Sequence, residues 1–144
     1  MANPVCEVRL TEAPLHALAQ IEYGSGAIVD FFGAVRPVEA EREISGIQYE
    51  ANSDMALHQL EKIAGEAVTQ FRLTCAIVHH RLGFVPTGEA SVFVRTSGRH
   101  RRETYDANAW IMNELKNRVP IWKWPQFASV DQVLTAEPEA LVAR

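Results

Sequence analysis

The stretch ELKNRVPIWKWPQF, residues 114–127, joins a predicted helix to a predicted extended segment. Apolar side chains recur there and upstream at every fourth position, at Ala107, Ile111, Leu115 and Val119. This spacing is typical of a helix with one face in the core. Pro120 lacks an amide donor and disfavours the α region at the preceding residue, so we expect the helix to end there.

Two lysines flank this break. Lys116 lies on the predicted helix one face away from the apolar ladder, beside Met112. In the extended segment, Lys123 shares a side with Ile121, whereas Trp122 points the other way. If the segment folds back along the helix, both amines can face one cavity. The alternative is a solvated helix end, where cations are favourable because of the helix dipole.

Outward from this stretch, strands and helices alternate. The patterns predict strands at 5–10, 27–36, 44–51, 73–83 and 90–97, the second of them substantially buried. They predict helices at 13–23 and 52–71, the latter capped by Asn52 or Ser53, and a third helix that Ser97 caps. Residues 36–43 form a charged segment without periodicity, which predicts a mobile loop. The class is therefore α+β with a mixed sheet, and the 144 residues suit one domain, 1–144.

The bulk composition excludes several classes of protein. A net charge of −4 disfavours a general nucleic-acid binder, so any anion site must be a local cluster of Lys and Arg. No apolar stretch approaches about 20 residues, and no secretory signal is apparent, which favours a cytoplasmic protein. Cys6 and Cys75 form no zinc pattern, and the adjacent His79 and His80 point to opposite faces of a strand. We therefore expect neither a metal site nor a cofactor.

Two further basic positions stand out. GRHRR, residues 98–102, places His100 and Arg101 at a helix N-terminus, where backbone N–H groups attract anions and basic side chains are otherwise unfavourable. Arg36 ends a strand at a loop, although an ordinary surface arginine is equally consistent with that position. The chain has no G-x-S-x-G elbow, P-loop or GxGxxG motif. If it is an enzyme, lysine must move the protons, or a partner must bring the reactive group.

Several segments together resemble a known family. GAIVDFFGAVR, GIQYEA, HRLGFVPTGEASVFV, SGRHR and IMNELKNRVPIWK follow, in order, the pattern of the catalytic (large) subunit of molybdopterin synthase. The resemblance covers about residues 26–123, and LKNRVPIWK is its most specific piece. It implies an α/β-hammerhead fold and a homodimer within a heterotetramer. It also implies a small ubiquitin-like sulfur carrier, whose C-terminal Gly-Gly thiocarboxylate enters the pocket of the large subunit. The implied reaction transfers sulfur to cyclic pyranopterin monophosphate and forms the molybdopterin dithiolene.

The resemblance also implies roles for particular residues. Lys116 and Lys123 match the two lysines of the motif, and His100, Arg101 and Arg36 match its other basic positions. Phe31 and Met112 match positions that line the pocket. On this basis Lys123 handles proton transfer or transient covalent capture at the pterin carbon, and Lys116 holds the carrier terminus or the substrate. The remaining three basic residues grip the phosphate.

The chain departs from the family pattern near Lys123. Trp124, Pro125 and Gln126 stand where the family usually has a basic residue and Glu, and the tail from Phe127 onward has no counterpart in the pattern. Two alternatives to the enzyme stay open: a non-catalytic paralogue that binds a ubiquitin-like carrier, and a phosphate- or RNA-binding module that uses GRHRR and the tryptophans.

Overall fold

The computed structural model describes residues 3–128 and 139–140, so most of the tail from Phe127 onward lies outside the described residues. The elements follow in chain order: β1 (Val5–Thr11), β2 (Ala27–Ala34), β3 (Val38–Glu39), β4 (Arg42–Ala51), α1 (Ser53–Phe71), β5 (Cys75–Arg81), β6 (Gly83–Pro86), β7 (Ala90–Gly98), α2 (Arg101–Arg118), β8 (Ile121–Phe127) and β9 (Glu139–Ala140).

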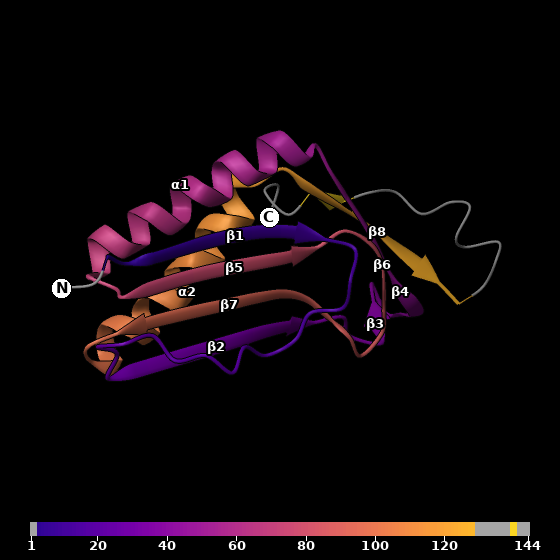
Figure 1. The fold of residues 1–144 in the computed structure, drawn as a ribbon. Helices are drawn as coiled ribbons and strands as arrows, with labels where there is room; N and C mark the ends of the chain where they lie inside the picture. Colours follow the sequence, from indigo (N-terminus) through magenta and orange to yellow (C-terminus); the bar gives the residue numbers. More distant parts are fainter. Residues whose placement is uncertain (1–2, 129–138, 141–144) are drawn as a thin grey trace.

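Four strands form the larger sheet, in the order β1-β5-β7-β2. β1 runs parallel to β5, whereas the pairs β5–β7 and β7–β2 are antiparallel. Both helices lie on one face of this sheet, α1 against β1 and β5, and α2 against β7 and β2 (Figure 1). The main core fills the space between sheet and helices. The predicted α+β class, with a mixed and mainly antiparallel arrangement and two long helices, is confirmed.

The second sheet has five strands but fewer residues, and we call it the smaller sheet: β3, β4, β8 and β9 lie in that order, and β6 also pairs with β4. β8 begins shortly after the last residue of α2 and runs antiparallel to β4, so that Lys123 lies opposite Tyr49. The pairing of β8 with β4 therefore holds the strand that carries Lys123 against the rest of the fold. None of the helices in the described part of the chain is long and apolar enough to cross a membrane.

The two long helices agree with the sequence. The side-chain oxygen of Asn52 accepts a hydrogen bond from the backbone N–H of Met55, as an N-cap does, at 3.2 Å. All four residues of the predicted ladder are buried, and Val119, the C-cap of α2, is extended (φ −94°, ψ 121°) before Pro120. The predicted cap at Ser97 is wrong, because Ser97 lies inside β7 and the N-cap position belongs to His100.

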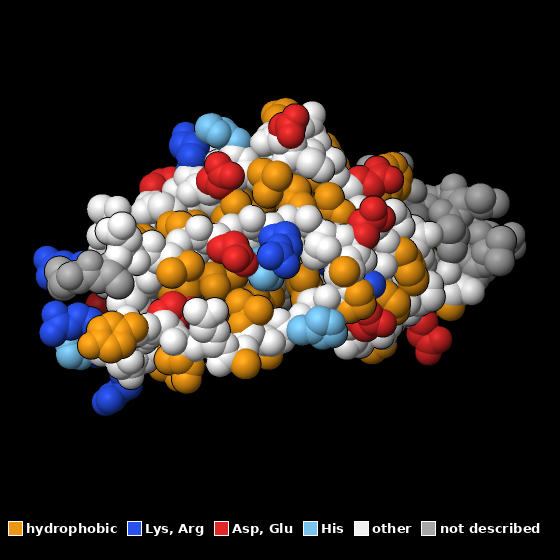
Figure 2. All heavy atoms as spheres, viewed as in Figure 1, with side chains coloured by type: hydrophobic (Ala, Val, Ile, Leu, Met, Phe, Trp, Pro, Cys, Tyr) orange, Lys and Arg blue, Asp and Glu red, His pale blue; other side chains and the backbone are white. Residues whose placement is uncertain are grey.

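The predicted helix at 13–23 is wrong. This segment runs without helix or strand across the sheet face opposite the helices, where Leu15 and Leu18 pack against buried side chains. Arg95 donates hydrogen bonds to the backbone carbonyl oxygens of Leu18 and Gln20. The tertiary contacts of this segment outweigh its local helical pattern. Hydrophobic side chains are visible between charged ones on this face of the molecule (Figure 2).

Two further predictions need correction. The strand at 27–36 ends at Ala34 and is an edge strand of the sheet, so Phe31 and Phe32 are about 40% exposed rather than substantially buried. The predicted loop at 36–43 contains a hairpin, in which β3 pairs with the start of β4. Its turn residues Ala40 and Glu41 have φ of 49° and 64°, a geometry that usually calls for Gly or Asn. Because the turn lacks those residues, no local signal in the sequence predicts the hairpin.

Candidate active site

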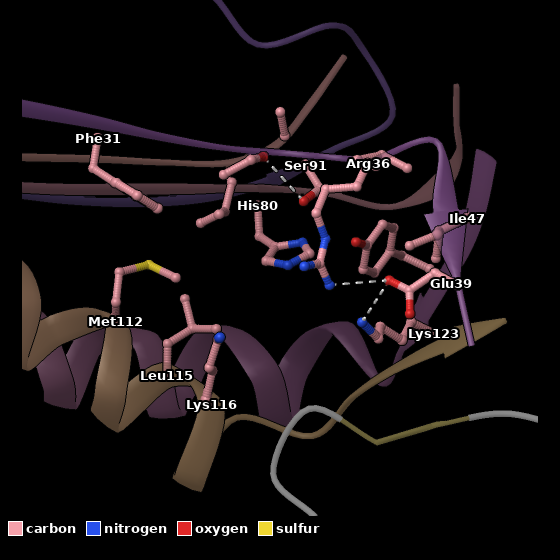
Figure 3. Close-up of a pocket in the computed structure, with 15 residues that line it drawn as sticks. Phe31, Arg36, Glu39, Ile47, His80, Ser91, Met112, Leu115, Lys116 and Lys123 are labelled. Carbon is pink, nitrogen blue, oxygen red and sulfur yellow. Dashed lines mark hydrogen bonds and ion pairs between the residues drawn. The ribbon is translucent and has the colours of Figure 1, made fainter. Parts of the chain in front are cut away.

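A cavity of about 290 Å³ lies between the C-terminal half of α2, the end of β2 and the smaller sheet (Figure 3). Polar and apolar groups contribute about equally to its wall, and its charged groups are three cations and one carboxylate. The lining residues are Phe31, Gly33, Ala34, Val35, Arg36, Glu39, Ile47, Tyr49, His80, Ser91, Val92, Met112, Leu115, Lys116 and Lys123.

The last two turns of α2 supply one wall. Met112 and Lys116, four residues apart, project into the cavity, while Ile111 and Leu115 anchor the helix in the core. Lys116 is an exposed side chain in the last turn, where its charge also stabilises the helix through the dipole. The wall therefore combines an apolar thioether with an accessible ammonium group.

Lys123 enters the cavity from the other side. Alternation along β8 buries Ile121 and Lys123 on one side and leaves Trp122 47% exposed on the other, as the sequence predicts. Lys123 itself is only 7% exposed. Lys116 and Lys123 thus line one cavity, which agrees with the shared-cavity interpretation rather than with a solvated helix end.

Arg36 reaches the cavity from just beyond β2. Its guanidinium Nη2 lies 3.8 Å from Oε1 of Glu39, and most of its side chain is exposed. Phe31, earlier on the same strand, lines the cavity on the same side as the helices. The structure therefore brings five of the seven predicted site residues into one pocket: Phe31, Arg36, Met112, Lys116 and Lys123.

Glu39 is a site residue that the sequence did not reveal. Its Oε1 lies 3.7 Å from Nζ of Lys123 as well as 3.8 Å from Arg36, and only 14% of its side chain is exposed. A carboxylate therefore does accompany Lys123, but it comes from β3 rather than from the residues after the lysine. No local signal in the sequence marks Glu39, because an exposed Val38 beside a half-buried Glu39 reverses the usual pattern of burial.

His80 is a second residue of the pocket that the sequence did not mark as a site residue. Its Nδ1–H donates to the carbonyl oxygen of Arg81 at 2.8 Å, and its ring meets Tyr49 edge-on. Burial lowers the pKa of His80 to about 4, since desolvation disfavours the imidazolium form. His80 is therefore a neutral part of the pocket wall near pH 7. His79 lies on the opposite face of β5, as the sequence predicts. It is hydrogen-bonded to Glu7.

His100 and Arg101 do not line this pocket. They lie at the N-cap and first residue of α2, both exposed, at the end of the molecule where basic side chains gather (Figure 2). With a rise of 1.5 Å per residue, Arg101 begins the helix about 22 Å from Lys116. Within one chain the two groups cannot hold the same ligand.

The arrangement suits an anionic ligand that also has an apolar or planar part. Ser91 lines the cavity, but its hydroxyl donates to the carbonyl oxygen of Gly33. Cys6 and Cys75 lie outside the pocket, and burial raises the pKa of the Cys75 thiol to about 12. No group of three or more metal-binding side chains occurs among the described residues. The pocket thus offers charge and lysine amines, and its lining includes no cysteine.

Known proteins resemble this chain in sequence and in fold. The family model described as MoaE protein matches residues 7–118. The molybdopterin synthase catalytic subunit of Pyrococcus abyssi is 41% identical over 108 residues, which cover 74% of this chain and 73% of that protein.

Solved structures agree on the fold. Molybdopterin synthase from Staphylococcus aureus superposes with a TM-score of 0.81 at 24% identity, over 90% of this chain and 94% of that one. A complex of subunits 1 and 2 of molybdopterin-converting factor from Helicobacter pylori gives a TM-score of 0.61 at 23% identity, over 74% of each chain. By its sequence match along most of its length, the chain belongs to the MoaE family of molybdopterin synthase catalytic subunits.

Proposed function

We propose that this chain transfers sulfur from the C-terminal thiocarboxylate of a small ubiquitin-like carrier to cyclic pyranopterin monophosphate, which yields the molybdopterin dithiolene. The observation that carries the proposal is the cavity that Arg36, Lys116 and Lys123 line together. Both reactants are anions, and the sulfur arrives on another protein. The pocket needs cations for such reactants and needs no nucleophile of its own.

The two lysines take different parts in this proposal. Lys123 is the more buried amine, and we assign to it proton transfer or transient covalent capture at the pterin carbon, because a shielded amine at a fixed position suits chemistry. Lys116 is exposed at the helix end, and we assign to it the capture of the carrier terminus or the substrate. Arg36 completes the phosphate site, since its guanidinium can bind two oxygens at once.

His100 and Arg101 have a place in this function only if a second copy of the chain brings them. Within the described residues no strand pairs with the outer edge of β2. The backbone N–H of Gly26 donates to the carbonyl oxygen of Gly98, so the start of β2 lies beside the residues that lead into α2, whereas Gly33 at its other end lines the pocket. Two β2 strands paired antiparallel about a two-fold axis would put the start of one against the end of the other. We propose this homodimer as the arrangement that delivers His100 and Arg101 to the pocket of the partner.

A mixing experiment tests that arrangement. Lys123→Ala and Arg101→Ala chains, each inactive as homodimers, are unfolded and refolded together. A mixed dimer contains one pocket in which both residues are intact, so sulfur transfer should return. If the mixture stays inactive although mixed dimers form, Arg101 does not act across the interface.

The function itself is tested with a carrier protein. The chain should co-purify with a small protein that ends in Gly-Gly and, given its thiocarboxylated form and the pterin precursor, should form the dithiolene product. Binding without product would favour the non-catalytic paralogue. Binding to neither the carrier nor the pterin phosphate would reject the proposal.

A further inference from the structure

We propose that Glu39 determines which ligands the pocket accepts: its carboxylate lies between Arg36 and Lys123 until a substrate anion displaces it. The inference rests on the proposed function, because it concerns the anion site of the same pocket. It adds a specificity-determining residue that the sequence pattern does not mark.

The contacts of Glu39 are those of an exchangeable counter-ion. One oxygen, Oε1, faces both Lys123 Nζ at 3.7 Å and Arg36 Nη2 at 3.8 Å (Figure 3). Charge-assisted hydrogen bonds between such groups are about 2.7–2.9 Å long. A phosphate or thiocarboxylate oxygen that approaches to that distance therefore interacts more strongly with these cations than Glu39 does.

Burial makes this exchange selective. The side chains of Glu39 and Lys123 are 14% and 8% exposed, so water screens their attraction poorly. A neutral ligand that displaced Glu39 would leave Lys123 buried without this counter-charge, which is costly. Only a ligand that brings its own negative charge can replace the carboxylate without that cost, so Glu39 rejects neutral molecules and weakly bound anions.

The hairpin that carries Glu39 has the geometry for such a displacement. β3 is two residues long and pairs only with Arg42 and Glu43, whereas the pairing of β4 with β8 begins at Ile44. The turn residues 40 and 41 hold positive φ, a conformation that persists where surrounding contacts maintain it. The two ion pairs of Glu39 are such contacts. Movement of β3 away from the cavity would not break the β4–β8 pairs from Ile44 onward, which hold the strand that carries Lys123.

The test compares Glu39→Gln with a matched control. Glu43→Gln removes an exposed carboxylate from the same hairpin. Inorganic phosphate is titrated into each full-length chain by calorimetry, without carrier. Without a competing carboxylate, Glu39→Gln should bind phosphate about tenfold more tightly than wild type, as expected for the loss of one like charge near the ligand. Glu43→Gln should match wild type. Unchanged or weaker phosphate binding by Glu39→Gln would overturn the inference.

Steady-state kinetics provide a second readout. Glu39→Gln should lower KM for the pterin phosphate and also lower kcat, because Lys123 loses the group that positions it. A purely structural role for Glu39 would not move the two constants in the same direction. Should Glu39→Gln fail to fold, Glu39→Asp keeps the charge but draws it back by one methylene. Its phosphate affinity should then exceed that of wild type, and an affinity equal to wild type would count against the inference.

The two proposals can fail separately. Tighter phosphate binding by Glu39→Gln in a chain without sulfur transfer would reject the proposed function and keep this inference. An active chain whose phosphate affinity is the same before and after the Glu39→Gln substitution would reject this inference and keep the function.

Discussion

Two clusters of charged side chains lie on opposite faces of the larger sheet, and they differ in how their cations are held. On the face without helices, Arg95 is 3% exposed, and all three of its guanidinium nitrogens are engaged. Asp30 accepts two hydrogen bonds from it, at 2.7 and 2.8 Å, and backbone carbonyl oxygens of the segment at 13–23 accept others. On the helix face, Glu39 faces Lys123 and Arg36 at 3.7 and 3.8 Å.

Arg95 is therefore a structural cation, whereas the cations of the pocket are available to a ligand. Hydrogen bonds from Arg95 to Asp30 raise the pKa of Arg95 and fix its position, so this cluster joins the irregular segment at 13–23 to the sheet. The carboxylate in the pocket makes ion pairs longer than hydrogen bonds and lies beside a cavity of about 290 Å³. We therefore expect changes in the Arg95 cluster to alter stability, and changes in the pocket to alter sulfur transfer.

Lys123→Ala should have the largest effect and should separate the two clusters most clearly. Sulfur transfer should fall to background, because the proposed acid, base or covalent group is lost. The free energy of unfolding should fall by less than in Arg95→Met, because Glu39 keeps Arg36 as a partner. Transfer assays and denaturant titration check both values. Unaltered turnover would reject the role of Lys123.

Arg95→Met should have the converse effect. The substitution removes the hydrogen bonds from Arg95 to Asp30 and the ion pair between Arg95 and Glu22. It also removes the hydrogen bonds that Arg95 donates to two backbone carbonyl oxygens. Breaking a buried ion pair by removing one partner typically costs about 3–5 kcal/mol. Denaturant unfolding should show this loss, while the phosphate affinity of the folded protein stays near that of wild type. A stable Arg95→Met chain with weaker phosphate binding would contradict the division between the clusters.

Lys116→Ala should reduce sulfur transfer about a hundredfold, as the loss of one group that stabilises a developing charge commonly does. Because Lys116 is exposed, stability should change by less than about 0.5 kcal/mol. Lys62→Ala, at an exposed lysine of α1 outside the pocket, is the matched control and should keep full activity. Equal losses in the two variants would mean that net charge, and not the position of Lys116, matters.

His80→Gln should change how stability depends on pH. The pKa of His80 is about 4 in the folded chain, below its ordinary value of 6.5. Between these values the unfolded state binds a proton that the folded state does not, so stability falls as pH falls from 6.5 towards 4. From pH 7 to pH 5 this loss is about 2 kcal/mol. Unfolding curves of His80→Gln should lack that part of the pH dependence; an unchanged slope would show that His80 titrates normally.

Much of the fold was predictable because local signals and tertiary contacts agree. The ladder of α2, the stop at Pro120 and the alternation along β8 set the sides on which Lys116 and Lys123 lie, whereas the pairing of β8 with the distant strand β4 brings both lysines to one cavity. The segment at 13–23 was not predictable, since its conformation depends on Arg95, which is 75 and 77 residues away from the carbonyl groups that it binds.

The site was predictable only in part, for a similar reason. Residues that a motif or a strand end marks, such as Arg36 and Met112, were found. Glu39 was not, because its function depends on a hairpin whose turn lacks the usual residues. His100 and Arg101 carry a signal in the sequence, but one chain cannot bring them to the pocket.

The proposed sulfur transfer requires the carrier terminus to enter the cavity between Lys116 and Lys123. A crystal structure of this chain with a bound carrier that ends in Gly-Gly is the decisive test. The terminal carboxylate should lie in the cavity, about 3 Å from Nζ of one of these lysines. A terminus bound elsewhere on the surface, with the cavity occupied only by solvent, would contradict the account.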